Sequence, residues 1–136
     1  RGSSLMQDNF KAEIVSPEKV IFSGNSAMTT IPSYEGDMSI LKNHIPIIAF
    51  LRPGIIKIKK DDKNNEEFFI QDGIVEFFND ILVVLSSSAI NTKNLSKEFI
   101  DKLSNDTKEK LSKKDINDQE RYILNHQLDV LKDVRV

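Results

Sequence analysis

The chain has 136 residues, a hydrophobic fraction of 39%, a formal net charge of -2 and no cysteine. This length fits one domain with a small appendage, and the near-neutral charge gives no reason to expect nucleic acid or an anionic lipid surface as partner. The absence of cysteine excludes disulfides and thiolate chemistry, and no apolar run approaches the roughly 20 residues of a membrane-spanning helix, so direct lipid insertion is not expected.

The first nine residues are expected to lie outside the fold. Arg1-Gly2-Ser3-Ser4 reads as an expression-vector remnant and Met6 as the native start, so residues 1–9 are interpreted as a remnant followed by a flexible N-terminus.

Residues 10–90 are expected to form a β-sandwich domain. Short apolar runs alternate with turn signals about every ten residues, which is typical of an all-β sandwich or barrel. Pro32 is expected to end one strand, because proline cannot donate to a sheet ladder. The expected strands cover residues 10–15, 20–22, 27–31, 38–41, 45–51, 55–60, 68–70, 74–78 and 81–85.

Two turns in the middle of this region stand out, at residues 34–37 and 52–54. Gly36 can adopt positive φ, and Pro53 pre-sets φ for a tight turn. The first turn carries the carboxylates of Glu35 and Asp37, which a glycine-kinked tip would project away from the sheet. This arrangement favours docking to a basic partner over chemistry.

The pattern changes after residue 85. Residues 86–92 are small and are expected to form a hinge, and residues 91–136 then carry apolar side chains at helical spacing. Ser96 is a candidate N-cap, and Asn117 with Glu120 resembles a capping arrangement for a second helix. The second half therefore predicts a two-helix antiparallel hairpin.

Residues for catalysis or cofactor binding are not found. His44 and His126 are far apart, and no spacing typical of a metal site, a phosphate-binding loop or a serine nucleophile occurs. We therefore expect no catalytic residue, no cofactor and no metal.

An ordered set of motifs resembles a known family, the epsilon subunit of F-type ATP synthases, whose mitochondrial counterpart is called delta. The resemblance covers about residues 10–90 well and the helical tail in architecture only. The motifs are Ser16-Pro17-Glu18, Phe22-Ser23-Gly24, Glu35-Gly36-Asp37-Met38-Ser39-Ile40-Leu41, His44-Ile45-Pro46, Leu51-Arg52-Pro53-Gly54 and Phe69-Ile70-Gln71-Asp72-Gly73-Ile74-Val75-Glu76-Phe77.

The resemblance implies a flattened sandwich of about ten strands, a two-helix hairpin and a non-catalytic role. The implied function is a central-stalk rotor subunit of a proton-translocating ATP synthase, which links the gamma subunit to the c-subunit ring and couples rotation to ATP synthesis. The implied location is peripheral, at the cytoplasmic face of the bacterial inner membrane. If the tail extends, catalytic beta subunits become a further partner.

The resemblance also implies contact residues. Glu35, Asp37 and His44 are expected to face the c ring, and Ser16 and Ala49 the gamma subunit. The alternatives are that the two carboxylates only face water, that His44 is a corner residue bonded to local backbone, and that Ile47, Ile48 and Phe50 beside Ala49 belong to the core.

The tail departs from the family pattern. Some bacterial members bind ATP through Leu-Asp-x-x-Arg-Ala, whereas this chain has Leu95-Ser96-Lys97-Glu98-Phe99-Ile100, so we expect no ATP sensing. Residues 116–136 carry four acidic and three basic side chains, a net charge of -1, which does not favour insertion against an acidic segment. We expect weak or no self-inhibition. The alternatives are an inhibitor of ATP hydrolysis acting through an extending hairpin and, in another class, a free-standing sandwich that binds a small ligand.

Overall fold

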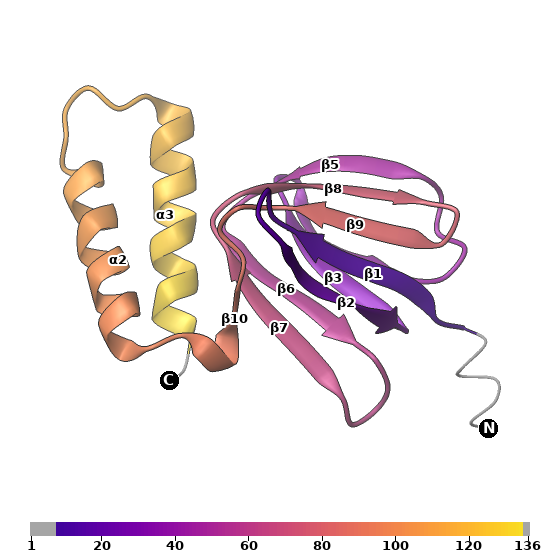
Figure 1. The fold of residues 1–136 in the computed structure, drawn as a ribbon. Coiled ribbons are helices and arrows are strands. Elements are labelled where there is room, and N and C mark those ends of the chain that lie inside the picture. Colours follow the sequence, from indigo (N-terminus) through magenta and orange to yellow (C-terminus); the bar gives the residue numbers. More distant parts are fainter. Residues whose placement is uncertain (1–7, 135–136) are drawn as a thin grey trace.

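The computed structural model describes residues 8–134, so most of the predicted N-terminal remnant, residues 1–7, lies outside the described part. Figure 1 shows a curled β-sheet followed by two antiparallel helices, with α3 between α2 and the sheet. The strands are β1 Phe10–Val15, β2 Val20–Ser26, β3 Met28–Ser33, β4 Gly36–Ile40, β5 Ile47–Leu51, β6 Gly54–Lys59, β7 Asn65–Ile70, β8 Gly73–Phe78, β9 Ile81–Leu85 and β10 Ile90–Asn91. The short 3-10 helix η1 Thr92–Asn94 leads to α2 Lys97–Leu111 and α3 Asp118–Asp133.

The ten strands form a sandwich of two layers, as predicted. The order is β10-β7-β6-β3-β5-β8-β9-β1-β2, with β4 on the free side of β3. A single residue pair, Ser33 with Leu51, joins β3 to β5, and the sheet folds over there. The core between the layers includes Ile14, Ile31, Ile56, Val75 and Phe77, each at most 1% exposed.

Alternation along the strands explains which side chains enter this core. In β6, Ile56 and Ile58 are buried whereas Lys57 and Lys59 are exposed, because successive side chains point to opposite faces. Gly54 begins this strand where a Cβ atom would lie 2.6 Å from Cβ of Pro32, so the two strands approach closely only because residue 54 is glycine.

Several expected strand bounds were wrong. β2 runs on to Ser26 instead of ending at residue 22, and β7 begins at Asn65 instead of residue 68. β3 does not end before Pro32 but continues to Ser33, because the proline needs no donor there and its carbonyl accepts a hydrogen bond from the Arg52 N–H at 2.9 Å. The strand expected from Ile45 begins only at Ile47, and Ile45 is 71% exposed.

The segment expected to form a hinge, residues 86–92, makes hydrogen bonds to the sandwich and contains a short strand. The Ser86 hydroxyl donates to the Asp72 carbonyl at 2.8 Å, and the Gln71 N–H donates to the Ser88 hydroxyl at 2.9 Å. Ile90 and Asn91 then form β10 against β7. The link between sheet and helices is therefore fixed at both ends.

The helix caps are those that the sequence predicts. The Ser96 hydroxyl accepts from the Phe99 N–H at 3.0 Å at the start of α2. Asn117 and Glu120 form a reciprocal capping box at the start of α3, with bonds of 2.8 and 3.0 Å. These local bonds set where each helix begins.

The hairpin covers the outer face of β6 and β7. Phe69 is fully buried beneath it and forms a second apolar cluster with Leu95, Ile100 and Leu131. Burying such a side chain contributes about 1.5–3 kcal/mol, so this cluster is a substantial source of docking free energy. Between the helices, Gln127 donates to the Thr107 hydroxyl at 2.9 Å, and both side chains are buried.

Candidate functional site

The turn between β3 and β4 presents two carboxylates at one end of the sandwich. We call residues 34–37 the acidic tip. Gly36 has φ 126°, a region that favours glycine, and its carbonyl accepts a hydrogen bond from the Ser33 hydroxyl at 2.6 Å. Glu35 is exposed, and the Asp37 side chain is 70% exposed. Both carboxylates can therefore meet a partner without a change in the sheet.

Arg52 connects the acidic tip to helix α3. One amino group of its guanidinium, Nη2, lies 3.5 Å from Oδ1 of Asp37. The other, Nη1, lies 3.2 Å from Nδ1 and 3.3 Å from Nε2 of His126. The Arg52 side chain is only 18% exposed, and its buried Nε has no hydrogen-bond partner among the described residues.

The environment of His126 favours its neutral form. Burial lowers the pKa of His126, and the positive charge of Arg52 lowers it further, whereas Asp129 opposes both effects. A neutral imidazole can accept a hydrogen bond from Arg52, which a protonated imidazole cannot do.

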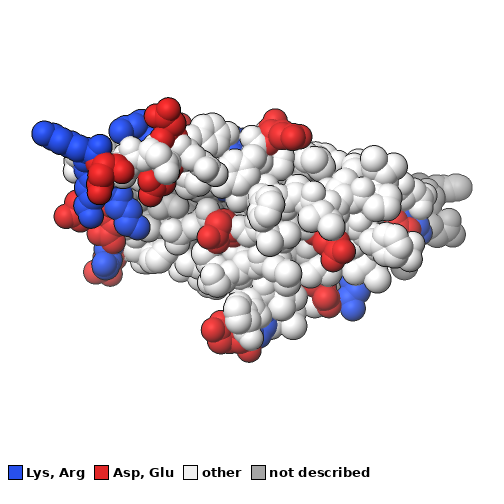
Figure 2. Space-filling model, turned by 90° about the horizontal axis from the view of Figure 1, so that it is seen from above, with Lys and Arg blue, Asp and Glu red and all other residues white. Residues whose placement is uncertain are grey.

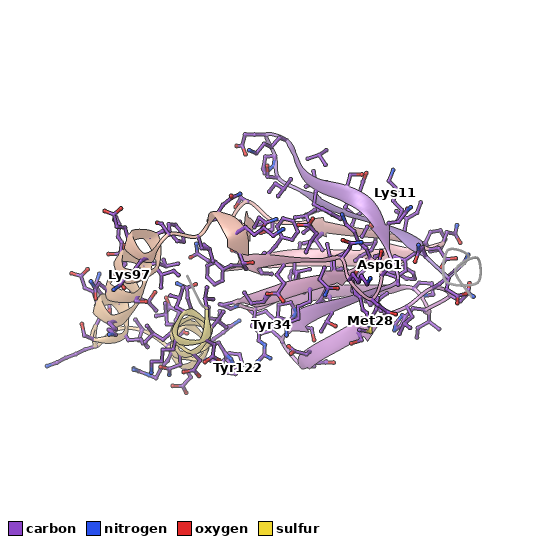
Figure 3. The ribbon with its side chains drawn as sticks, turned by 90° about the horizontal axis from the view of Figure 1, so that it is seen from below. Lys11, Met28, Tyr34, Asp61, Lys97 and Tyr122 are labelled. Carbon is purple, nitrogen blue, oxygen red and sulfur yellow. The ribbon has the colours of Figure 1, made fainter. Side chains whose placement is uncertain are left out.

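A pair of tyrosines forms a second contact between the acidic tip and α3. The rings of Tyr34 and Tyr122 stack with centroids 6.2 Å apart and planes at 22°. The Tyr122 hydroxyl donates to the Tyr34 carbonyl at 3.4 Å, and its ring also meets the His126 ring edge-on at 4.3 Å. Figure 3 shows Tyr34 beside α3, next to Tyr122.

His44 lies away from the acidic tip. Its Nδ1 is 2.7 Å from the Ile45 carbonyl, and its ring meets the edge of Phe77 with centroids 6.0 Å apart. The preceding Asn43 has φ 70°, a left-handed conformation that asparagine tolerates, and its N–H donates to Asp80 at 2.7 Å.

The structure therefore does not bring the three predicted ring-facing residues together. Glu35 and Asp37 lie where β4 begins, and His44 follows the far end of β4. β5 runs back from the neighbourhood of Phe77 to Leu51. A five-residue strand spans about 17 Å, which separates His44 from the tip.

Ser16 and Ala49, the predicted gamma contacts, line two hollows on either side of Phe50. Ser16 is buried, donates to the Lys19 carbonyl at 3.2 Å, and lines a hollow of about 670 Å³. Ala49 packs against the core and lines a hollow of about 540 Å³ that also contains Tyr34 and Glu35. Phe50 borders both hollows.

A group of exposed apolar side chains lies on β5, β8 and β9. We call it the apolar face, and its exposed members are Ile48, Phe50, Ile74, Phe78, Ile81 and Leu85, between 38% and 74% exposed. Cross-strand neighbours such as Phe50 with Ile74 and Ile74 with Leu85 connect its members, and the exposed Glu76, opposite Ile48, is a charged residue within it. Figure 2 looks onto the side where β5 and β8 lie in Figure 1, and the surface over the sandwich is mostly white with scattered carboxylates.

The core alternative is therefore wrong for Ile48 and Phe50, which point outward, and holds for the half-buried Ile47. Sequence reasoning missed the rest of the face. The signal was present in β9, which is apolar at every position, and in part in β8, where Ile74 and Phe78 lie on the outward side with Glu76 between them, although this layer has one face in the core.

Within residues 8–134, no three His, Asp or Glu side chains gather closely enough to hold a metal ion. No helix there has the length and apolar character needed to cross a membrane.

Comparisons of the sequence with known proteins agree on one family. Residues 9–92 match the family described as the ATP synthase, Delta/Epsilon chain, beta-sandwich domain. The ATP synthase epsilon chain of Pelagibacter ubique is 45% identical over 129 residues, covering 93% of this chain and 98% of the relative. The epsilon chain of Parvibaculum lavamentivorans is 33% identical over 134 residues, covering 96% and 98%.

Solved structures share the fold. A chain in the Euglena gracilis mitochondrial ATP synthase, in a structure of OSCP, F1 and the c-ring, aligns with a TM-score of 0.70 at 17% identity, covering 91% of this chain and 78% of that one. A chain in the central stalk and c-ring of the Tetrahymena thermophila enzyme aligns with a TM-score of 0.60 at 12% identity, covering 90% and 92%.

Proposed function

The chain belongs to the delta/epsilon family of ATP synthase subunits, and from this membership we propose that it is the rotor subunit that joins gamma to the c-subunit ring. As an epsilon chain it is a structural subunit of the F-type ATP synthase and is not itself catalytic. Its work is to couple rotation to ATP synthesis. The solved structures with the same fold come from F1, central-stalk and c-ring assemblies, which supports this role.

The apolar face is the observation that carries the proposal. A contiguous apolar patch on a sheet is expected to be covered by a partner, and an aromatic side chain such as Phe50 is enriched at protein interfaces. The helical hairpin covers the other layer of the sandwich and leaves this face open. Gamma binds here, with Ser16 and Ala49 contributing from the hollows on either side of Phe50.

The acidic tip is the surface for the c ring. Glu35 and Asp37 are exposed carboxylates on the turn between β3 and β4, and they suit basic side chains on the polar loops of a ring. The expected part of His44 in this contact stays a prediction, because the structure holds that residue at the other end of β4.

The proposed contacts imply where the subunit is located in the cell. A subunit that touches the ring from outside the bilayer is peripheral, and the similarity to bacterial epsilon chains favours the cytoplasmic face of the inner membrane of a proton-translocating enzyme.

The hairpin exerts weak or no inhibition on this function. It is docked on β6 and β7 through Phe69 and Leu131, and the described part of α3 carries four carboxylates against two cations. ATP is not sensed at the start of α2, because Ser96 caps the helix and Phe99 packs into the apolar cluster. Isothermal titration is expected to show no saturable ATP binding.

A pull-down with gamma and purified c ring tests the proposal. Wild-type chain is expected to recover both, and Phe50→Asp is expected to lose gamma, since a carboxylate would enter an apolar contact. Asn65→Asp makes the same change in charge on the other layer and is expected to bind normally. Recovery of neither partner by the wild-type chain would refute the role.

A further inference from the structure

Two side chains of the sandwich reach from the acidic tip to helix α3. Tyr34 is part of the tip itself, and it contacts Tyr122 through both ring stacking and a hydrogen bond to its carbonyl. Arg52 lies beneath the tip and contacts Asp37 and His126 at the same time. Helix α3 therefore contacts Tyr34, the first residue of the tip, directly. It contacts Asp37, the last residue of the tip, through the guanidinium of Arg52.

The Arg52 contact is directional. The guanidinium is planar, so fixing Nη1 against His126 also fixes where Nη2 points. Only 18% of the side chain is exposed, which leaves it little freedom to turn away. With α3 in place, Nη2 points at Asp37 and holds the tip by its carboxylate.

The exposure of the acidic tip determines whether docking of the hairpin helps or hinders binding at the tip. The Asp37 side chain remains 70% exposed while α3 is docked, and Glu35 is exposed as well. Helix α3 thus supports the tip from behind and leaves its carboxylates accessible. A docked hairpin orders the binding surface without occupying it, and a surface ordered in advance binds more tightly.

We propose that helix α3 supports the ring-facing tip, so that docking of the hairpin and binding of a basic partner at Glu35 and Asp37 strengthen each other. This inference rests on the proposed role of the tip. The coupling is reciprocal: a hairpin that is released loosens the tip, and a ring that is bound holds the hairpin down. Tyr122, His126 and Arg52 are positioning residues in this scheme.

The experiment uses the full chain with Tyr122→Ala, His126→Ala or, as control, Asn125→Ala, an exposed position on the same helix. The first measurement is hydrogen exchange of the backbone amides of residues 33–38 in the free chain, which needs no partner. Tyr122→Ala and His126→Ala are expected to speed this exchange at least about fivefold, with helix content unchanged by circular dichroism. Unchanged exchange would overturn the proposal.

The second measurement is affinity for purified c ring, with Asp37→Lys measured alongside. The expected result is a loss of about fivefold for Tyr122→Ala and for His126→Ala, and none for Asn125→Ala. Normal affinity of the two α3 variants, with a loss for Asp37→Lys, would overturn the coupling alone. Normal affinity of all variants would show instead that the tip does not face the ring, and this result would overturn the coupling as well.

Discussion

Arg52 and His126 are 74 positions apart in the sequence, yet Nη1 of the arginine lies 3.2 Å from Nδ1 of the histidine. This contact joins the sandwich to the hairpin on the side where Tyr34 and Tyr122 also meet. The position of the hairpin is therefore linked to a titratable group, and the same contact extends to Asp37 in the acidic tip.

Docking of the hairpin is expected to weaken in acid. Burial and Arg52 lower the pKa of His126 from its ordinary 6.5, so the docked state prefers neutral histidine. The docking free energy is then fully present above pH 6.5 and is lost as the pH falls through the lowered pKa. The other charges around the groove at His126 are those of Asp37, Lys57, Glu67, Asp129 and Asp133.

The aromatic signal of the two tyrosines can report this loss of docking. The chain has no tryptophan, and its two tyrosines both lie at this contact. Near-ultraviolet circular dichroism is expected to lose intensity as the pH is lowered below 6.5. His126→Gln should abolish the transition, and His44→Gln should retain it. A transition that persists in His126→Gln would assign it to other groups.

Asp37→Lys is expected to weaken binding to the c ring and to remove much of its dependence on salt. The substitution replaces an exposed carboxylate by a cation, which repels a basic ring loop and also faces Arg52. Affinity measured at several salt concentrations checks this, with Asp62→Lys in the loop between β6 and β7 as matched control. Equal binding by Asp37→Lys and wild type would show that the acidic tip does not take part in the contact with the c ring.

Thr107→Val is expected to destabilise the hairpin by about 1–3 kcal/mol, because the buried Gln127 amide loses its acceptor. The double variant Thr107→Val with Gln127→Leu should recover most of this loss, since neither buried group then lacks a partner. Urea unfolding followed by far-ultraviolet circular dichroism measures both. A double variant less stable than Thr107→Val would contradict the explanation.

Deleting residues 92–136 is expected to leave the ATP hydrolysis rate of the assembled enzyme within about twofold of wild type, the small change expected of a docked tail with no basic second helix. The rate is measured with the gradient dissipated. Strong activation by the deletion would show that the tail is an inhibitor.

Local signals predicted much of the fold. Alternation and turn residues identified most of the strands, Gly36 identified a positive-φ position, and Ser96 and Asn117 identified the helix starts. Each of these depends on neighbours a few residues away, which the sequence displays directly.

Contacts between segments distant in the sequence could not be predicted from local patterns. The hydrogen bonds at Ser86 and Ser88 replaced an expected hinge, because their partners lie on the turn before β8. The Tyr34–Tyr122 stack and the Arg52 bridge join segments that no local pattern relates. The apolar face was missed in β8 and β9 because a strand with apolar residues on both sides does not reveal which side is covered.

The most direct test is proton-driven ATP synthesis by purified synthase in vesicles, measured with the chain removed, restored, or replaced by Phe50→Asp. We expect synthesis to fall steeply on removal, to return with the wild-type chain, and to stay low with Phe50→Asp. Full synthesis and unchanged assembly without the chain would contradict a coupling role.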